Sequence, residues 1–312
     1  MSIRERLDSL FAGVDGGQTS TIAVVADARG AILGRGIGGP CDEIGESSDS
    51  RRLADAIEAA VGGALIDAGL DPSAEIDVVV AGLSGYDGTL TGAAPRLRAR
   101  SLRLMHDAPI ALAGAIDGPG IVLIAGTGSV AYGEDAAGRW ARAGGWGYLF
   151  GDRGSAFWIA RSALSEAMRA FDAGVECSLA EAALAHFGSP DLRALARDFY
   201  SGRISRAQLA GFAILVAQAA ATDPRARAIV DHGGLALAKL AARVKRCLEF
   251  RSSVRVALCG GVFSEDALRV ATERALGGDE DVEIVVAAAS PAIGALRLAY
   301  REAGVSVGAI AG

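Results

Sequence analysis

The spacing of apolar residues divides the first third of the chain into short strands and one long helix. Residues 10–37 contain apolar runs separated by DGGQ and DARG, which predicts three antiparallel strands joined by tight turns. Residues 50–68 place apolar side chains at helical spacing and predict a helix. The runs IDVVVAGLSG and LRLMHD follow as strands, with a further helix expected between them.

The same order of elements then starts again. The segment IVLIAGTGSVAYGEDAAGRWARAG contains apolar runs around a small-residue turn, with a second turn at DAAG. After it we expect helices over 155–174, 192–221 and 224–250, a strand over 254–258, and a helix over 290–303. One α/β unit used twice is the simplest interpretation. It predicts an N-terminal lobe over 1–110, completed by a C-terminal helix in 290–312, and a C-terminal lobe over 111–289.

Composition narrows the class of protein. A chain of 312 residues can support two packed lobes, and 51% hydrophobic against 22% charged residues excludes a disordered chain. The formal net charge of −6, with basic residues spread along the chain, argues against nucleic-acid or membrane-surface partners. The start MSIRERLDSLFAG lacks the features of a signal peptide, and no apolar run is long enough to span a bilayer, which predicts a cytoplasmic protein.

The cysteines give no sign of a metal or disulfide framework. The four cysteines lie far apart without C-x-x-C spacing: Cys41, Cys177, Cys247 and Cys259. We therefore expect each of them to be a small residue of the core. His106, His186 and His232 also show no ligand spacing, although His106 precedes a candidate catalytic aspartate.

Three glycine turns carry the candidate phosphate chemistry. In the first, Asp15 precedes Gly16, Gly17, Gln18, Thr19 and Ser20, where backbone N–H groups and hydroxyls can approach an anion. Asp15 is expected to face Mg²⁺, through water, because a carboxylate beside phosphate needs an intervening cation. The alternative is a plain hairpin with glycine at positive φ. The chain has only two lysines, Lys239 and Lys245, and neither follows such a loop, so a Walker-type lysine is excluded.

The second and third turns each follow a buried strand. Gly126, Thr127, Gly128 and Ser129 again combine glycine with hydroxyls. Gly260 and Gly261 lie between the strand VRVAL and a helix expected near Ser264, where an adenine ring and ribose could lie against the backbone. An ordinary strand-to-helix turn is the alternative for this last pair.

These segments resemble a known superfamily over nearly the whole chain. DGGQTST, AGTGS and LCGGV are similar to the phosphate-1, phosphate-2 and adenosine motifs of the actin, sugar kinase and Hsp70 ATPases. GGWGYLFGDRGSAFWIARSAL resembles a segment of the N-acetylglucosamine kinase and BadF/BadG/BcrA/BcrD ATPase family. The resemblance implies an α/β, two-lobed actin-like ATPase fold of the ribonuclease H type, with duplicated domains and an interlobe cleft. It also implies a sugar kinase that uses ATP and Mg²⁺ and acts on a hexosamine 6-hydroxyl, with a homodimer suggested by relatives.

The resemblance also implies residue roles. Asp107 matches the catalytic aspartate, with a helix N-cap as its alternative role. Substrate contacts are implied for a further set: Asp42, Ser84, Gly85, Gly145, Trp146, Gly147 and Asp152. Trp146 could instead pack between the lobes, and Asp152 could cap the helix that begins near Gly154.

Some positions depart from the family pattern. Arg153 stands in GDRGS where the family has GDEGS, Asp42 follows Cys41 where relatives commonly have Asn, and Gln18 replaces a glycine. A carboxylate at 42 would favour a free amine, hence glucosamine over N-acetylglucosamine. N-acetylmannosamine and N-acetylmuramic acid stay open. The alternatives of another class are an ATPase activator of a radical acyl-CoA dehydratase or reductase, which needs closely placed cysteines, and a non-catalytic sugar sensor.

Overall fold

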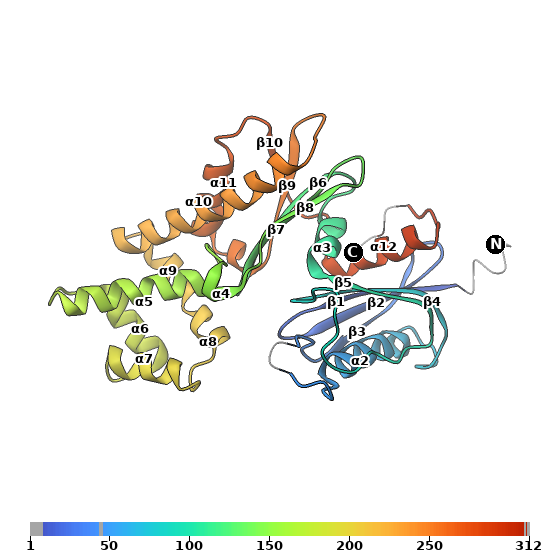
Figure 1. Ribbon diagram of the computed structural model, residues 1–312, viewed down its shortest axis with the longest axis horizontal. Helices are drawn as coiled ribbons and strands as arrows, with labels where there is room; N and C mark the ends of the chain where they lie inside the picture. Colours follow the sequence, from blue (N-terminus) through green and yellow to red (C-terminus); the bar gives the residue numbers. More distant parts are fainter. Residues whose placement is uncertain (1–8, 44–45, 309, 311–312) are drawn as a thin grey trace. The chain divides into compact units, whose positions relative to one another are not determined.

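The computed structural model describes residues 9–43, 46–308 and 310, and it divides the chain into two compact units. Unit 1 consists of residues 1–118 and 286–312, and unit 2 of residues 119–285. The boundary expected after residue 110 would cut through helix α3 (Asp107–Ala115). This helix belongs to unit 1 because it packs against α12 (Pro291–Glu302), which returns to that unit (Figure 1).

Unit 1 is built on one mixed sheet of order β3-β2-β1-β4-β5. The first three strands pair antiparallel, as predicted, whereas β4 and β5 run parallel to β1. One face carries α2 (Arg52–Asp67), and the other carries α3 and α12. The strands are β1 (Leu10–Gly16), β2 (Thr21–Asp27), β3 (Ile32–Gly38), β4 (Ile76–Leu83) and β5 (Ala99–His106).

Small residues let α2 lie directly on β3. Gly34, Gly36 and Gly38 occupy alternate positions of the strand and therefore face the same side. A Cβ at Gly36 would lie 2.0 Å from the carbonyl oxygen of Ala60 in α2, and the other two positions are equally close to helix carbonyls. The close approach of the two backbones explains why this strand is rich in glycine.

The helix expected between β4 and β5 is absent, and residues 84–98 form a loop. Gly85 and Gly88 have positive φ there, a conformation that a helix cannot contain. Carboxylates from elsewhere satisfy the backbone: Glu43 accepts the N–H groups of residues 91 and 92, and Glu58 accepts that of Arg96. These distant partners replace the hydrogen bonds of a helix.

Unit 2 repeats the strand order of unit 1 in a second mixed sheet, β10-β9-β6-β7-β8. The β6–β7 and β7–β8 pairs are antiparallel, and β9 runs parallel to β6 and β10. The two antiparallel hairpins followed by parallel strands correspond to β1–β5 of unit 1. The bounds are β6 (Gly120–Ala125), β7 (Ser129–Glu134), β8 (Trp140–Gly144), β9 (Val254–Cys259) and β10 (Val282–Val285).

The helices of unit 2 agree with the sequence in part. The predicted helices near 155–174 and 224–250 are α5 (Ala156–Asp172) and α10 (Pro224–Cys247). The single helix expected over 192–221 is wrong, because the chain turns at Gly202, which has positive φ, and restarts at Ser205 in a capping box with Gln208. The remaining elements are α4 (Gly147–Phe150), α6 (Ser178–Phe187), α7 (Leu192–Tyr200), α8 (Arg206–Gly211), α9 (Ala213–Ala219), η1 (Gly261–Ser264) and α11 (Asp266–Leu276).

Two further findings concern the expectations from composition. Within the described ranges, no helix is both long and apolar enough to cross a membrane. Cys41 and Cys177 are buried and Cys259 is partly buried, as expected of core residues. Cys247 is exposed instead, because it is the last residue of α10.

Candidate functional site

The first glycine turn lies between β1 and β2 and is fixed by backbone hydrogen bonds. The N–H of Gly17 donates to the carbonyl of Ser20 at 2.9 Å, and the N–H of Cys41 donates to the carbonyl of Gly17 at 3.1 Å. Gly16 must be glycine because a Cβ there would lie 2.5 Å from the Cys41 sulfur. Neither glycine has positive φ, so the plain-hairpin alternative does not account for them.

The predicted substrate turn at Ser84 and Gly85 lies beside this loop. The N–H of Ser84 donates to the carbonyl of Gly16 at 2.8 Å, and Gly85 has a φ of 81°. Both residues line a pocket of about 190 Å³ in unit 1, together with Cys41 and Glu43. Unit 1 thus brings the residues from Gly16 to Ser20 together with Ser84 and Gly85.

Asp15, at the end of β1, is a carboxylate in an unfavourable environment. Burial, and secondarily the negative charge of Asp107, raises its pKa from 3.8 to about 6. A cation at this position would relieve both effects, because it would replace the lost hydration and offset the repulsion. The local chemistry therefore fits a metal ion better than it fits a structural role.

Asp107 is the first residue of α3 and does not cap it. The cap is His106, whose Nδ1 accepts the N–H of Ala108 at 3.1 Å. The same Nδ1 lies 2.7 Å from Oδ1 of Asp107. Oδ1 of Asp107 is buried and has no hydrogen-bond partner among the described residues. An unsatisfied carboxylate oxygen suits a group that accepts a proton.

Asp42, the departure from the family pattern, is not a free charge. Its Oδ1 lies 2.7 Å from Nη2 of Arg52 in α2, and the other guanidinium nitrogen binds Glu46 at 3.1 Å. The ion pair removes the reason to expect Asp42 to favour an amine.

The second glycine turn joins β6 to β7 in unit 2. The N–H of Gly126 donates to the carbonyl of Gly128, and the carbonyl of Gly126 accepts the N–H of Ala156 at the start of α5, both at 2.9 Å. Thr127, at the tip of this turn, is partly exposed. The β6–β7 loop and the first turn of α5 therefore form one rigid corner.

Asp152 lies against this corner. Its Oδ1 accepts the N–H of Ser129 at 3.2 Å, and a Cβ at Gly128 would be 3.0 Å from its Oδ2. It is buried, which raises its pKa, although the Ser129 N–H opposes the rise. It has a φ of 52°, a strained conformation for a residue with a side chain. The predicted capping role is wrong, because Ser155 is the N-cap of α5.

The other predicted residues of unit 2 lie near the same corner. The N–H of Gly145 donates to the carbonyl of Ser129 at 2.9 Å, and Gly145 and Gly147 both have positive φ. Trp146 between them is 71% exposed, so it does not pack in a core of unit 2. Gly260 has a φ of 102°, and a Cβ there would be 2.4 Å from the carbonyl oxygen of Ala125, which places Gly260 and Gly261 beside the end of β6.

The surroundings of Asp15 fit Mg²⁺. In the part of the chain that the structure describes, no group of three or more His, Cys, Asp or Glu residues could hold a metal ion. Mg²⁺ does not require one, because it is usually bound by one or two carboxylates together with phosphate oxygens and water. Asp15, beside a loop of glycines and hydroxyls, meets that requirement.

Sequence reasoning missed the residues that make contact from other elements. Arg52 reaches Asp42 from α2, and Lys239 and Arg243 of α10 line a pocket with Trp146 and Asp152. Solvent-facing positions of a helix carry no sequence signal for such contacts. The adjacency of His106 and Asp107 was the one visible hint.

Two α/β units with the same strand order and with glycine turns at corresponding hairpins form a fold that is also found in a sugar kinase. A solved sugar kinase, the glucokinase of the ROK family from Streptomyces griseus, has this fold with a TM-score of 0.53 at 20% identity, over 94% of this chain and all of that chain. The family model described as the BadF/BadG/BcrA/BcrD ATPase family matches residues 12–299. The chain belongs to the BadF/BadG/BcrA/BcrD ATPase family.

Named relatives are kinases of amino sugars. A Chromobacterium violaceum structure assigned as an N-acetylglucosamine kinase is similar with a TM-score of 0.76 and 30% identity, over 93% of this chain and 98% of that chain. The N-acetylmuramic acid/N-acetylglucosamine kinase of Clostridium acetobutylicum is 38% identical over 36% of this chain and 39% of that protein. The N-acetyl-D-glucosamine kinase of Dictyostelium discoideum is 30% identical over 56% of this chain and 59% of that protein. These alignments therefore span less than two thirds of either curated relative.

Proposed function

We propose that this protein is an ATP- and Mg²⁺-dependent kinase of an amino sugar. The observation that carries the proposal is Asp107, a carboxylate with one oxygen that is buried and unsatisfied. It lies near a second, partly buried carboxylate, Asp15, beside a phosphate-type loop. The three amino-sugar kinases similar to this chain support the choice of substrate class.

In the proposed reaction a sugar hydroxyl, which we take to be the 6-hydroxyl, attacks the γ-phosphorus of ATP. Its proton passes to Asp107, an oxygen–phosphorus bond forms at the sugar, and the bond to ADP breaks. Hydroxyls and backbone N–H groups within residues 16–20 and 126–129 would bind phosphate oxygens, except for the N–H groups of Gly17, Gly126 and Ser129, which already donate within the protein. The glycines at 260–261 would lie against the adenosine. Mg²⁺, held at Asp15 through water, would neutralise phosphate charge.

Sugar contacts are proposed for two groups of residues, one in each unit. In unit 1 these are Ser84 and Gly85 beside the first loop, with Asp42 held by Arg52. In unit 2 they are Gly145, Trp146, Gly147 and Asp152. Because Asp42 is held in an ion pair with Arg52 and is not a free carboxylate, we favour N-acetylglucosamine over glucosamine as the test substrate.

The test is an ADP-release assay with ATP and Mg²⁺ against hexoses, hexosamines and N-acetylhexosamines. Asp107→Asn should lower kcat by about a hundredfold or more, because it removes the proton acceptor and keeps the shape. Asp117→Asn is the matched control, since its carboxylate lies in the same unit and is almost fully exposed. If ADP release does not depend on any sugar, or if both variants behave alike, the proposal is wrong.

A further inference from the structure

Unit 2 contains a pocket of about 460 Å³ that the proposed kinase reaction does not fully use. Residues from the start of β7, the end of β8, α4, α5 and α10 line it. Trp146, Phe150 and Trp158 contribute aromatic side chains, and Phe150 is 89% exposed. The volume lies in the range of small-molecule sites, and exposed aromatic faces are suited to pack against a sugar ring.

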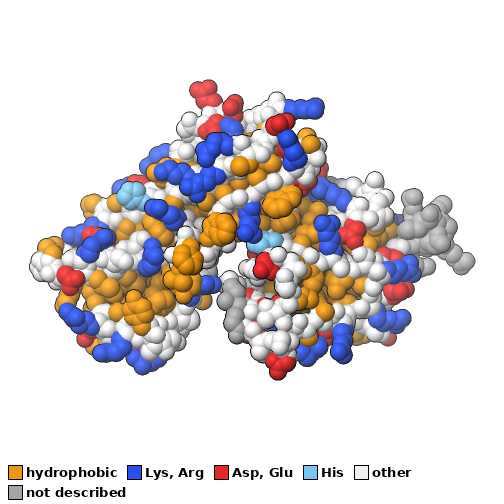
Figure 2. Space-filling view, in the orientation of Figure 1, with side chains coloured by type: hydrophobic (Ala, Val, Ile, Leu, Met, Phe, Trp, Pro, Cys, Tyr) orange, Lys and Arg blue, Asp and Glu red, His pale blue; other side chains and the backbone are white. Residues whose placement is uncertain are grey.

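Basic side chains gather around this pocket. Arg153, His232, Lys239 and Arg243 all line it, and none of them forms a hydrogen bond or ion pair through its side chain with another described residue. Figure 2 shows basic side chains along α10 in unit 2 next to exposed hydrophobic ones. Among the described lining residues, Asp152 is the single carboxylate, and Ser129 already donates to it. The pocket therefore has uncompensated positive charge.

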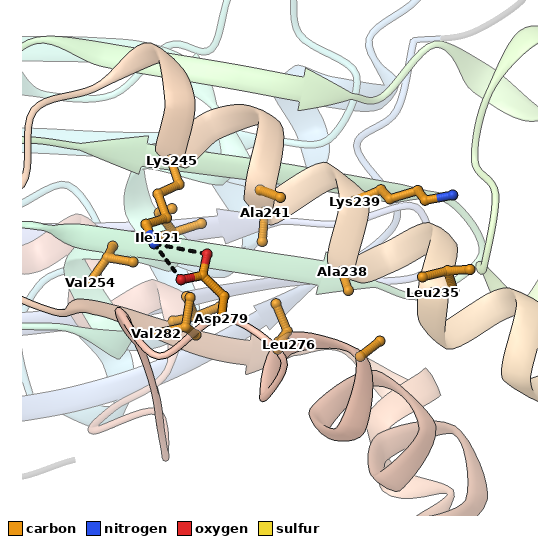
Figure 3. A pocket seen from close by; sticks show the side chains of 13 residues that line it. Ile121, Leu235, Ala238, Lys239, Ala241, Lys245, Val254, Leu276, Asp279 and Val282 are labelled. Carbon is orange, nitrogen blue, oxygen red and sulfur yellow. Dashed lines mark hydrogen bonds and ion pairs between the residues drawn. The ribbon is translucent and has the colours of Figure 1, made fainter.

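The other lysine of the chain behaves differently. Lys245 lies 2.7 and 2.8 Å from the two carboxylate oxygens of Asp279, at a smaller and largely apolar pocket between α10 and α11. Figure 3 shows this pair, and it shows the amine of Lys239 extending away from it. Of the two lysines, one is thus neutralised by the fold, and the other is left available at the larger pocket.

We propose that the larger pocket binds a sugar that carries an anionic group, either a carboxylate or a phosphate. Arg153, Lys239 and Arg243 would bind the anion, and Trp146 and Phe150 would contact the ring. The inference rests on the proposed function, because Trp146 and Asp152 belong to both sites.

Arg153 supports this choice of ligand. It follows Asp152 directly in the sequence, and its guanidinium lines the pocket without a carboxylate partner among the described residues. A guanidinium at this position attracts an anion. The ligand can be an acidic amino sugar that is phosphorylated, or a phosphorylated sugar that acts as an effector.

The experiment compares three probes that share one ring: N-acetylglucosamine, N-acetylmuramic acid, which adds a carboxylate, and N-acetylglucosamine 6-phosphate. Calorimetric titration of the full chain should show tighter binding of the two anions than of the neutral sugar, and added salt should weaken only the anions. The double variant Lys239→Gln, Arg243→Gln should weaken anion binding about tenfold or more. Arg246→Gln, at an exposed site of the same helix outside the pocket, should leave it unchanged.

ADP release then separates the two sources of the anion. Turnover of N-acetylmuramic acid, with its kcat/KM relative to N-acetylglucosamine falling in the double variant, identifies a substrate. A phosphorylated sugar that binds and alters the KM of the neutral sugar without being consumed identifies an effector.

Equal binding of all three probes, or anion binding that the double variant leaves intact, overturns the pocket proposal even if the neutral sugar is phosphorylated. Anion binding that is lost in the double variant, without any sugar-dependent ADP release, keeps the pocket and refutes the kinase.

Discussion

The substitution Asp15→Asn should make the protein more stable, although it removes the carboxylate proposed to hold Mg²⁺. Burial and the charge of Asp107 raise the pKa of Asp15 from 3.8 to about 6. The folded protein therefore binds this proton more tightly than the unfolded chain does, and stability is lost as the pH rises from about 4 through about 6. Above that range the ionised carboxylate lowers the free energy of unfolding by about 3 kcal/mol. Asparagine avoids this cost because it never ionises.

Urea denaturation of the protein without Mg²⁺ or nucleotide measures the effect. Asp15→Asn should gain about 3 kcal/mol in the free energy of unfolding at pH 8, and about half as much at pH 5, where much of the wild-type Asp15 is protonated. Glu280→Gln, at an exposed carboxylate, should show neither gain. A variant that is no more stable than wild type at pH 8, or a gain that does not change with pH, would refute the reasoning.

Two further predictions concern the packing of α2 on β3 and the contact of His106 with Asp107. Gly36→Ala should lower the free energy of unfolding by about 3 kcal/mol, because its Cβ would lie 2.0 Å from the Ala60 carbonyl oxygen. In contrast, Gly62→Ala in α2, which has open space around it, should raise the free energy of unfolding by about 1 kcal/mol. Urea denaturation measures both variants. His106→Asn and His106→Asp should both still cap α3, since either side chain can accept the Ala108 N–H. Only an aspartate at position 106 repels Asp107, so a steady-state assay should show a kcat for His106→Asp well below that of His106→Asn. Equal kcat values would contradict an effect of residue 106 on Asp107.

Local patterns in the sequence were sufficient for the elements that satisfy their own hydrogen bonds. The three antiparallel strands and α2 were predicted because alternation and helical spacing are properties of neighbouring residues. The loop at 84–98 was not predicted, because the carboxylates that accept its backbone N–H groups, those of Glu43 and Glu58, lie far away in the sequence.

The candidate site divides in the same way. Glycine turns such as Gly16–Ser20 are visible in sequence, because few other residues permit such close backbone approach. The pairing of Asp42 with Arg52, and the position of Lys239 and Arg243 beside Trp146, depend on how α2 and α10 pack on their sheets. The sequence therefore indicated the loops and their carboxylates, but not the basic side chains that α2 and α10 bring near them.

The direction of the pKa shifts separates structural carboxylates from candidate functional ones. Among the described carboxylates whose pKa departs from the ordinary value, the pKa is lowered at caps, turns and ion pairs. Examples are Asp223, the N-cap of α10, and Asp279, which pairs with Lys245. It is raised at Asp15 and Asp152, in both cases chiefly by burial. A carboxylate with a raised pKa destabilises the fold at neutral pH, so stability alone gives no reason to keep it. One lies beside the first glycine turn in unit 1 and the other against the second in unit 2. Both units thus carry the same costly arrangement at the loop proposed to bind phosphate, as expected if function and not packing selects these two acids.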